Sequence, residues 1–219
     1  MSDSLSILAL DTAYGEISAC ILSADKIHLS AVAKNQENKT RSTMIMPVLD
    51  DLLRQAGLTW TDLDILAFGC GPGSFTGLRI AAATLAGINA GLKLPILHIS
   101  SLAITAQQAD SPDPIRVVED ARAGEAFVGY YHGDTSTQAD ACLIWEEVSA
   151  LPAADFVCLN EVPQALPGWQ RQPLQLNRSE ALARTVKIAM ASTANWSDLP
   201  HFPSPVYLQI SQAERNAHG

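Results

Sequence analysis

The first part of the chain contains three successive segments with a strand-like pattern of hydrophobic residues. Residues 6–13 are mainly apolar, and residues 16–23 and 26–34 alternate between apolar and polar positions, a period of two that is typical of β-strands. Only tight turns, around Gly15 and Asp25, separate the three segments. Strands joined so closely pair antiparallel, because parallel neighbours need a long crossover connection. The sequence therefore predicts an antiparallel meander at the start of the chain.

A helical periodicity replaces this pattern at residues 42–56. Ser42 or Thr43 is a suitable N-cap for the helix, and Gly57 is a suitable C-terminal stop. The apolar stripe of the helix consists of Met44, Ile45, Val48, Leu49, Leu52 and Leu53. It is broader than contact with one neighbouring element requires. Two interpretations stand: part of the stripe faces another subunit, or the whole stripe lies in the protein's own core.

A strand–helix–strand unit is expected next. A strand at residues 64–69 runs into a glycine-rich turn, a helix spans residues 75–91, and a further strand covers residues 95–99. This order and spacing predict a right-handed βαβ crossover.

The second half of the chain is less regular but contains the same kinds of element. The expected elements are a helix at residues 100–109, strands at residues 115–121, 125–131 and 141–147, and an amphipathic helix at residues 180–194. We therefore expect two lobes, formed by residues 1–100 and 101–195. Residues 196–219 are a candidate to complete the first lobe.

The charge balance argues against direct binding of nucleic acid. The chain has 14 Lys and Arg residues against 23 Asp and Glu residues, for a formal net charge of -9, so its surface repels polyanions. The arginines are scattered and form no basic cluster with interleaved aromatic residues. Any contact with nucleic acid is therefore expected to be indirect.

The sequence indicates no membrane segment. The N-terminal residues lack a basic flank, and Asp11 interrupts their apolar run, so they do not resemble a signal peptide. The uncharged apolar stretch at residues 80–92 is too short to cross a bilayer. We expect a cytoplasmic protein.

The most distinctive motif is GCGPGSFTGLR at residues 69–79, between an expected strand and an expected helix. Glycine permits backbone conformations that other residues avoid, and the N–H groups at a helix N-terminus suit a phosphate. The candidate phosphate-binding residues are Gly71, Gly73, Ser74, Thr76 and Gly77. The motif matches none of the common phosphate-loop, dinucleotide or nucleophile-elbow patterns. A purely structural strand-to-helix turn therefore stands as the other interpretation.

Four motifs together resemble the TsaB family, also known as YeaZ. They occur in the family's order over nearly the whole chain and read LALDTA, GPGSFTGLR, DARAGE and PVYL. The resemblance implies an α/β fold of the actin-like ATPase type (ASKHA, RNase H-like), with two lobes that each contain a five-stranded mixed sheet flanked by helices. The meander predicted above would be the first part of the first sheet.

The resemblance also implies a function. TsaB pairs with TsaD, and TsaE joins them, to transfer a threonylcarbamoyl group to N6 of adenosine 37 in tRNAs that read ANN codons. This chain would be the noncatalytic scaffold of that complex. It would form a heterodimer with TsaD and a homodimer in its absence, and it would contact tRNA only indirectly.

A degenerate nucleotide site is expected at the end of the first strand. In the implied fold, the turn after that strand holds the nucleotide phosphates, and Asp11 and Thr12 occupy this place. Tyr14 and Glu16 add bulk and negative charge where a phosphate-binding hairpin favours small or basic residues. We therefore expect no firmly bound cofactor. ATP or ADP at the degenerate site, or at the seam with the partner, remain the candidates.

No catalytic residue or metal site is expected from the sequence. TsaD carries two histidines four positions apart on its first long helix, which places both imidazoles on one face. The five histidines of this chain include no pair at i+3 or i+4. Metalloprotease activity is therefore not expected. The remaining alternative is an autonomous small-molecule kinase or ATPase of the same fold.

The two apolar helices are the segments best suited to an obligate interface. The residues expected to contact TsaD are Met44, Val48 and Leu52 on the first helix and Ala82, Ala86 and Ala90 on the second. Two departures from the family pattern lie outside this assignment. Arg41 replaces a histidine that is usual in the family, and Gln209 replaces a usual arginine.

Overall fold

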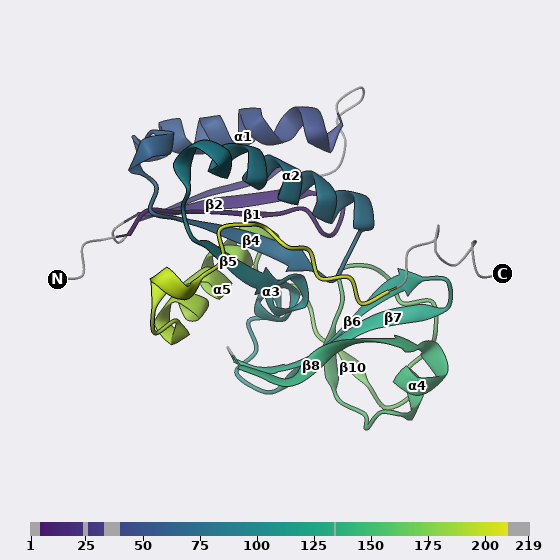
Figure 1. Cartoon of the computed structure of the whole chain (residues 1–219). Coiled ribbons are helices and arrows are strands. Elements are labelled where there is room, and N and C mark those ends of the chain that lie inside the picture. Colours follow the sequence, from purple (N-terminus) through teal and green to yellow (C-terminus); the bar gives the residue numbers. More distant parts are fainter. Residues whose placement is uncertain (1–4, 24–25, 33–39, 134, 210–219) are drawn as a thin grey trace.

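Two five-stranded sheets form the two lobes of the computed structural model, which describes residues 5–23, 26–32, 40–133 and 135–209 (Figure 1). The first sheet has the order β3 (Lys26–Val32), β2 (Ile17–Ser23), β1 (Ile7–Asp11), β4 (Ile65–Gly71), β5 (Ile96–Ser100). The first three strands in the chain pair antiparallel, and β4 and β5 are parallel to β1. This arrangement confirms the predicted meander and βαβ crossover.

The second sheet repeats the topology of the first. Its order is β10 (Gln170–Arg171), β9 (Asp155–Val157), β6 (Ile115–Arg122), β7 (Glu125–His132), β8 (Thr135–Ile144). Again an antiparallel meander is followed by two strands parallel to its first strand. Two sheets of this order, each flanked by helices, confirm the predicted actin-like fold.

Two expectations for the second lobe need correction. The strand expected at residues 141–147 ends at Ile144, and helix α4 (Trp145–Ala150) begins there, because the Glu147 carboxylate accepts a hydrogen bond from the Ile144 N–H and caps the helix. Strands β9 and β10 were not expected, since segments of three and two residues carry too little hydrophobic periodicity to be recognised.

Helices cover both faces of the first sheet. The helices are α1 (Arg41–Ala56) and α2 (Phe75–Leu92) on one face, and α3 (Ser101–Gln108) and α5 (Arg178–Ser192) on the other. Helix α5 follows the second sheet in the chain but packs on the first (Figure 1). The chain therefore returns to the first lobe at residue 178, earlier than the boundary at residue 195 that the sequence suggested.

Local hydrogen bonds and backbone conformation determine where α1 begins and ends. The N-cap is Thr40 rather than Ser42 or Thr43, because the Thr40 carbonyl already accepts hydrogen bonds from the N–H groups of Thr43 and Met44. The predicted stop at Gly57 is confirmed: its φ of 70° lies in the left-handed region that glycine adopts without strain.

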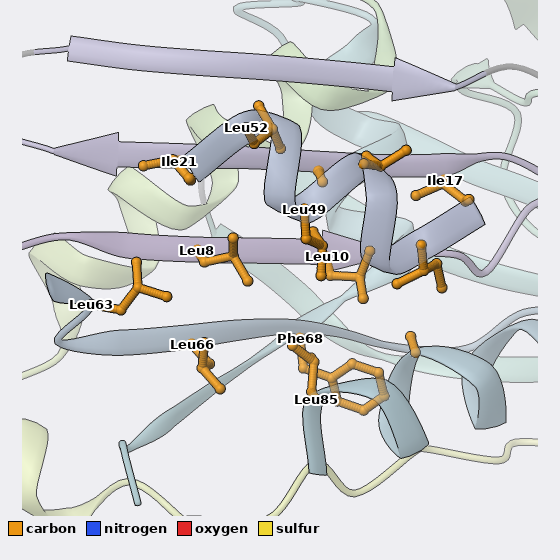
Figure 2. Packing of buried hydrophobic residues seen from close by; sticks show 14 of the residues in the cluster. Leu8, Leu10, Ile17, Ile21, Leu49, Leu52, Leu63, Leu66, Phe68 and Leu85 are labelled. Carbon is orange, nitrogen blue, oxygen red and sulfur yellow. The ribbon is translucent and has the colours of Figure 1, made fainter. Parts of the chain in front are cut away.

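Strand β1 is at the centre of the first lobe and is buried on both faces. Leu8 and Leu10 point towards α1 and α2, where they meet a cluster that includes Leu49 (Figure 2). Ile7 and Ala9 point to the opposite face and pack in the cluster that contains residues of α5. A strand that is covered on both sides reads as a continuous apolar run rather than an alternating one.

Helix α2 is apolar but only partly covered. Five of its 18 residues are buried: Gly77, Leu78, Ala81, Leu85 and Asn89. Within the described residues, α2 alone is long and apolar enough to cross a membrane by length and composition. Core helices of water-soluble proteins meet the same criteria, and here α2 packs on the first sheet.

Residues 200–209 form a C-terminal strap that runs from the first lobe to the second (Figure 1). The Pro200 carbonyl accepts a hydrogen bond from the Ile96 N–H of β5, and the Val206 N–H donates to the Cys70 carbonyl of β4, both at 2.7 Å. The Gln209 side chain then donates to the Glu125 carboxylate of β7 at 2.6 Å.

Gly87 provides a test of how exposed the outer face of α2 is. A Cβ atom added at Gly87 would meet nothing within 4 Å, so Gly87→Ala should raise the free energy of unfolding by about 0.5–1 kcal/mol through the higher helix propensity of alanine. Gly57→Ala is the matched control, and it should destabilise because alanine avoids a positive φ. Urea denaturation measures both, and destabilisation by Gly87→Ala would mean that this face is covered.

Candidate functional site

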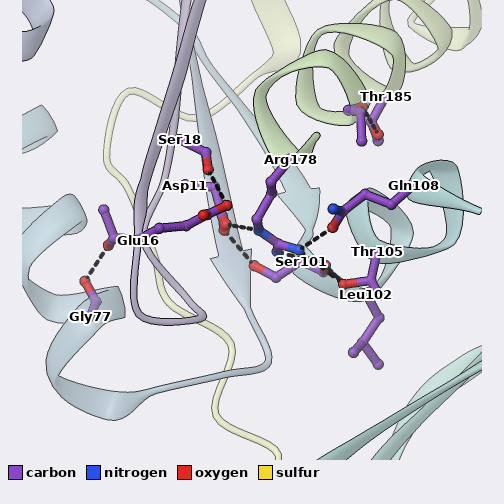
Figure 3. Close-up of polar contacts among 12 residues, drawn as sticks. Asp11, Glu16, Ser18, Gly77, Ser101, Leu102, Thr105, Gln108, Arg178 and Thr185 are labelled. Carbon is purple, nitrogen blue, oxygen red and sulfur yellow. Dashed lines mark hydrogen bonds and ion pairs between the residues drawn. The ribbon is translucent and has the colours of Figure 1, made fainter. Parts of the chain in front are cut away.

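The Asp11 side chain lies at the end of β1 and is completely buried. One carboxylate oxygen, Oδ2, forms an ion pair with Nε of Arg178 at 2.7 Å. The other, Oδ1, accepts a hydrogen bond from the Ser101 hydroxyl at 2.8 Å. Figure 3 shows the contacts of Asp11 with both side chains. The carboxylate that the sequence placed at a degenerate nucleotide site is therefore engaged by an arginine of the same chain.

Arg178 places the rest of its guanidinium group in contact with acceptors of α3. Nη1 donates to Thr105 Oγ1 at 2.9 Å and to Gln108 Oε1 at 3.2 Å, and Nη2 donates to the Ser101 carbonyl at 3.0 Å. Burial by itself would lower the pKa of Arg178, but the adjacent Asp11 carboxylate outweighs it, and the pKa is raised. The guanidinium therefore keeps its charge, and its contacts join β1, α3 and α5.

Sequence reasoning did not find Arg178. The residue stands at the first position of α5, next to the N-cap Asn177, whose side chain forms a capping box with Glu180. The capping box predicts where the helix starts. No local pattern shows that the adjacent arginine meets a residue 167 positions away.

The glycine-rich turn packs tightly against its surroundings. A Cβ atom at Gly69 would lie 2.2 Å from Asp11 Oδ1, one at Gly71 would lie 2.7 Å from the Val206 carbonyl oxygen, and one at Gly73 would lie 2.7 Å from the Ala13 Cβ. Glycine is required here by this close approach of β1 and of the C-terminal strap.

Three N–H groups of this turn have acceptors within the protein. Gly71 N–H donates to the Ser101 hydroxyl, Ser74 N–H donates to the Ala13 carbonyl, and Gly77 N–H donates to the Ser74 hydroxyl. The Thr12 hydroxyl donates to the Gly77 carbonyl at 2.7 Å. Ser74 is the N-cap of α2.

The predicted nucleotide-site residues thus come together in space. Asp11 and Thr12 lie beside the turn that contains Gly71, Gly73, Ser74 and Gly77, and Thr76 is exposed on the first turn of α2. In this arrangement the protein's own groups engage the N–H groups of Gly71, Ser74 and Gly77. Among the described residues, no group of three or more His, Cys, Asp or Glu side chains is placed to hold a metal ion.

The junction between the lobes holds two further buried polar side chains. Glu119 of β6 is 1% exposed and accepts a hydrogen bond from the Leu159 N–H at 2.9 Å. Burial raises the pKa of Glu119 to about 7, against the lowering influence of this hydrogen bond and of Arg178. Burial and the Glu119 charge together raise the pKa of Tyr14, whose buried hydroxyl has no hydrogen-bond partner within the described ranges.

A second polar contact joins the lobes at the start of α3. The Asp140 carboxylate accepts hydrogen bonds from Ser100 Oγ and from the Tyr131 hydroxyl, both at 2.5 Å. Ser100 ends β5 in the first lobe, whereas Tyr131 and Asp140 belong to the second sheet. The pKa of Asp140 is raised by burial.

The residues expected at the partner interface divide into buried and accessible ones. Val48 and Leu52 are 7% and 0% exposed and pack in the core of the first lobe, so this part of the prediction is wrong. The physical reason is that the apolar stripe of α1 covers Leu8 and Leu10 of the sheet (Figure 2). Of the other expected residues, the half-buried ones are Met44, Ala82 and Ala86, and the exposed one is Ala90.

The Asp11–Arg178 pair predicts a large and non-additive loss of stability on substitution. Arg178→Met leaves the carboxylate buried without its counter-ion and should lower the free energy of unfolding by about 3–5 kcal/mol. The double variant Asp11→Leu/Arg178→Met should lose less than the sum of the two single losses, since both charges are then gone. Denaturant unfolding of the four proteins measures the coupling, and simple additivity would contradict it.

The raised pKa of Glu119 predicts that the folded protein loses stability as the pH rises. The carboxyl has an ordinary pKa of 4.5 and a folded-state pKa of about 7, so its contribution is fully present below pH 4.5 and is lost as the pH rises through 7. The difference between the two pKa values corresponds to a change of about 3 kcal/mol in the free energy of unfolding. Urea unfolding of the wild type and of Glu119→Gln between pH 4 and 8 isolates it. If the two profiles run parallel, Glu119 does not hold its proton in the folded state.

Comparison with known proteins identifies the family. The family model for TsaD, tRNA N6-adenosine threonylcarbamoyltransferase, matches residues 30–150. The tRNA threonylcarbamoyladenosine biosynthesis protein TsaB of Escherichia coli is 32% identical over 180 residues, which cover 76% of this chain and 73% of that protein. TsaB of Haemophilus influenzae is 36% identical over 127 residues, 56% of this chain and about half (52%) of that protein's length.

A solved structure extends the similarity over nearly the whole chain. YeaZ from Pseudomonas aeruginosa superimposes with a TM-score of 0.74 at 28% identity, covering 93% of this chain and 100% of that one. The repeated sheet topology, the glycine-rich turn and these matches agree with one another. The chain therefore belongs to the TsaB family of tRNA threonylcarbamoyladenosine biosynthesis proteins.

Proposed function

We propose that this protein is a noncatalytic subunit of the complex that forms N6-threonylcarbamoyladenosine at position 37 of ANN-decoding tRNAs, and that it holds TsaD through the outer faces of α1 and α2. The observation that carries the proposal is the partial burial of α2. An apolar helix of 18 residues with five buried residues leaves a large face without cover. A permanent partner would remove this face from water.

The exposed face of α2 is suited to close contact with another helix. Four of its exposed positions, 83, 87, 90 and 91, are alanine or glycine and recur at helical spacing, and the exposed Arg79 precedes them on the same side of the helix. Residues as small as alanine and glycine let a second backbone approach closely. Met46 of α1 is 39% exposed and can add apolar area at the neighbouring surface. Charged residues, which are depleted in interface cores, are absent from these four positions.

The alternative of an autonomous kinase or ATPase is disfavoured by the surroundings of Asp11. A carboxylate that helps to place a magnesium ion needs oxygen atoms open to that ion. Both oxygens of Asp11 are engaged by Arg178 and Ser101, and the side chain is 0% exposed. The N–H groups of Gly71 and Ser74 in the glycine-rich turn are engaged as well. Nucleotide turnover by this chain alone would require both sets of contacts to open.

The remaining components follow from this assignment. TsaE joins the pair as a third protein, and the chain forms a homodimer through the same helices when TsaD is absent. Contact with tRNA comes through the partner, because a formal net charge of -9 repels a polyanion. ATP or ADP, where one is bound, lies at the seam with the partner. The complex works in the cytoplasm.

The test is a reconstituted modification reaction with variants of the outer face of α2. Gly87→Arg adds a long side chain at a position with open space around it, so the monomer should keep its fold. The same side chain would block a helix packed on α2, and both TsaD binding and tRNA modification should fall by at least about tenfold. Ala191→Arg, at an exposed position of α5, is the matched control and should leave both unchanged.

Two results would contradict the proposal. Normal modification with Gly87→Arg would show that α2 is not at the interface, and normal modification without this chain would remove its role altogether. ATP turnover by the purified chain, lost in Asp11→Asn, would favour the kinase or ATPase alternative.

A further inference from the structure

Arg116 is a buried arginine on the second lobe with an unusual environment. It lies on β6 and is 6% exposed. Its register partners are Tyr130 on β7 and Phe156 on β9. The guanidinium carbon lies 4.8 Å from the centre of the Tyr130 ring and 5.2 Å from the centre of the Trp169 indole. Trp169 in turn packs edge-on against Phe156. Aromatic rings therefore surround the cation.

No carboxylate neutralises this arginine among the residues that the structure describes. Arg178, the other buried arginine, has an ion pair and three further hydrogen bonds. The arginines that pair with a carboxylate on the surface are Arg54, Arg122, Arg171 and Arg184. For Arg116, by contrast, no hydrogen bond or ion pair is found within the described ranges, and its Nε atom is buried without an acceptor. Burial lowers the pKa of Arg116.

A buried guanidinium of this kind is only partly satisfied. Contact with aromatic rings stabilises the positive charge, but the buried Nε–H donor is left without an acceptor, and an unpaired buried donor is costly. Neighbouring N–H donors of a planar guanidinium form a fork that matches two oxygens of a carboxylate or a phosphate. With 6% of its surface exposed, Arg116 offers too little contact area for an extended polyanion.

We propose that Arg116, held by Tyr130 and Trp169, is a binding site for a single oxyanion group, a carboxylate or a phosphate monoester of a small ligand. The site is independent of the proposed TsaD surface, because β6 belongs to the second lobe whereas α1 and α2 cover the first sheet (Figure 1). Its ligand would complete the hydrogen bonding of the arginine and counter its buried charge.

NMR titration of the full chain tests the site. The probes are acetate and inorganic phosphate, each added at constant ionic strength against chloride, and the signals are the Arg116 Nε–H and the Trp169 indole N–H. Arg116→Lys identifies the first signal by its loss. The expected result is a saturable shift of both signals with one of the two anions, and the anion that binds more tightly tells a carboxylate ligand from a phosphate.

Two controls make the result specific. In Arg116→Lys the planar donors are lost, so the affinity reported by the Trp169 indole should fall by about tenfold. The Nε–H of Arg79, which stacks at 3.8 Å over the Phe75 ring but is exposed, should show no saturable shift. The proposal is overturned if neither anion gives a saturable shift, if chloride gives the same one, or if the indole responds equally in Arg116→Lys. In those cases the stack around Arg116 is structural only.

Discussion

The buried ion pair between Asp11 and Arg178 is the contact on which the arrangement of this molecule depends. Its carboxylate comes from the end of β1 and its guanidinium from the start of α5, and the remaining donors of the arginine bind α3. Two buried charges tolerate little displacement, because each is costly without the other. The pair therefore fixes the strand, the two helices and the glycine-rich turn relative to one another. In the same step it removes Asp11 from any contact with a bound cation.

Much of the fold can be predicted from short-range sequence patterns, but each lobe contains elements that such patterns do not predict. The meander, the βαβ unit and the stop at Gly57 follow from hydrophobic period and turn chemistry. Strands β9 and β10 do not, because they are held in place by pairing with β6 and with each other rather than by a pattern of their own. The return of α5 to the first lobe is equally hidden, since an amphipathic helix shows that it has a partner surface but not which one.

The candidate site was predictable in its location but not in its chemistry. The resemblance and the motif placed Asp11, Thr12 and the glycine-rich turn in one nucleotide site, and in the structure these residues lie side by side. The sequence could not show that Arg178 supplies the counter-ion, since the two residues are 167 positions apart. For the same reason the stripe of α1 was ambiguous. Only the packed structure shows that Val48 and Leu52 face the sheet, whereas positions 83, 87, 90 and 91 of α2 remain open.

The late position of α5 in the chain has a consequence for synthesis on the ribosome. The back of the first sheet, with Ile7, Ala9 and Cys20, is covered by residues 181–186 of α5. An N-terminal lobe usually folds as soon as it has emerged. Here the part of the first sheet that α5 covers stays exposed until almost the entire chain has been made. Until then the Asp11 carboxylate also lacks its partner Arg178. The nascent protein therefore exposes apolar surface during most of its translation. A chaperone that shields this surface until residue 192 has left the exit tunnel would favour correct folding.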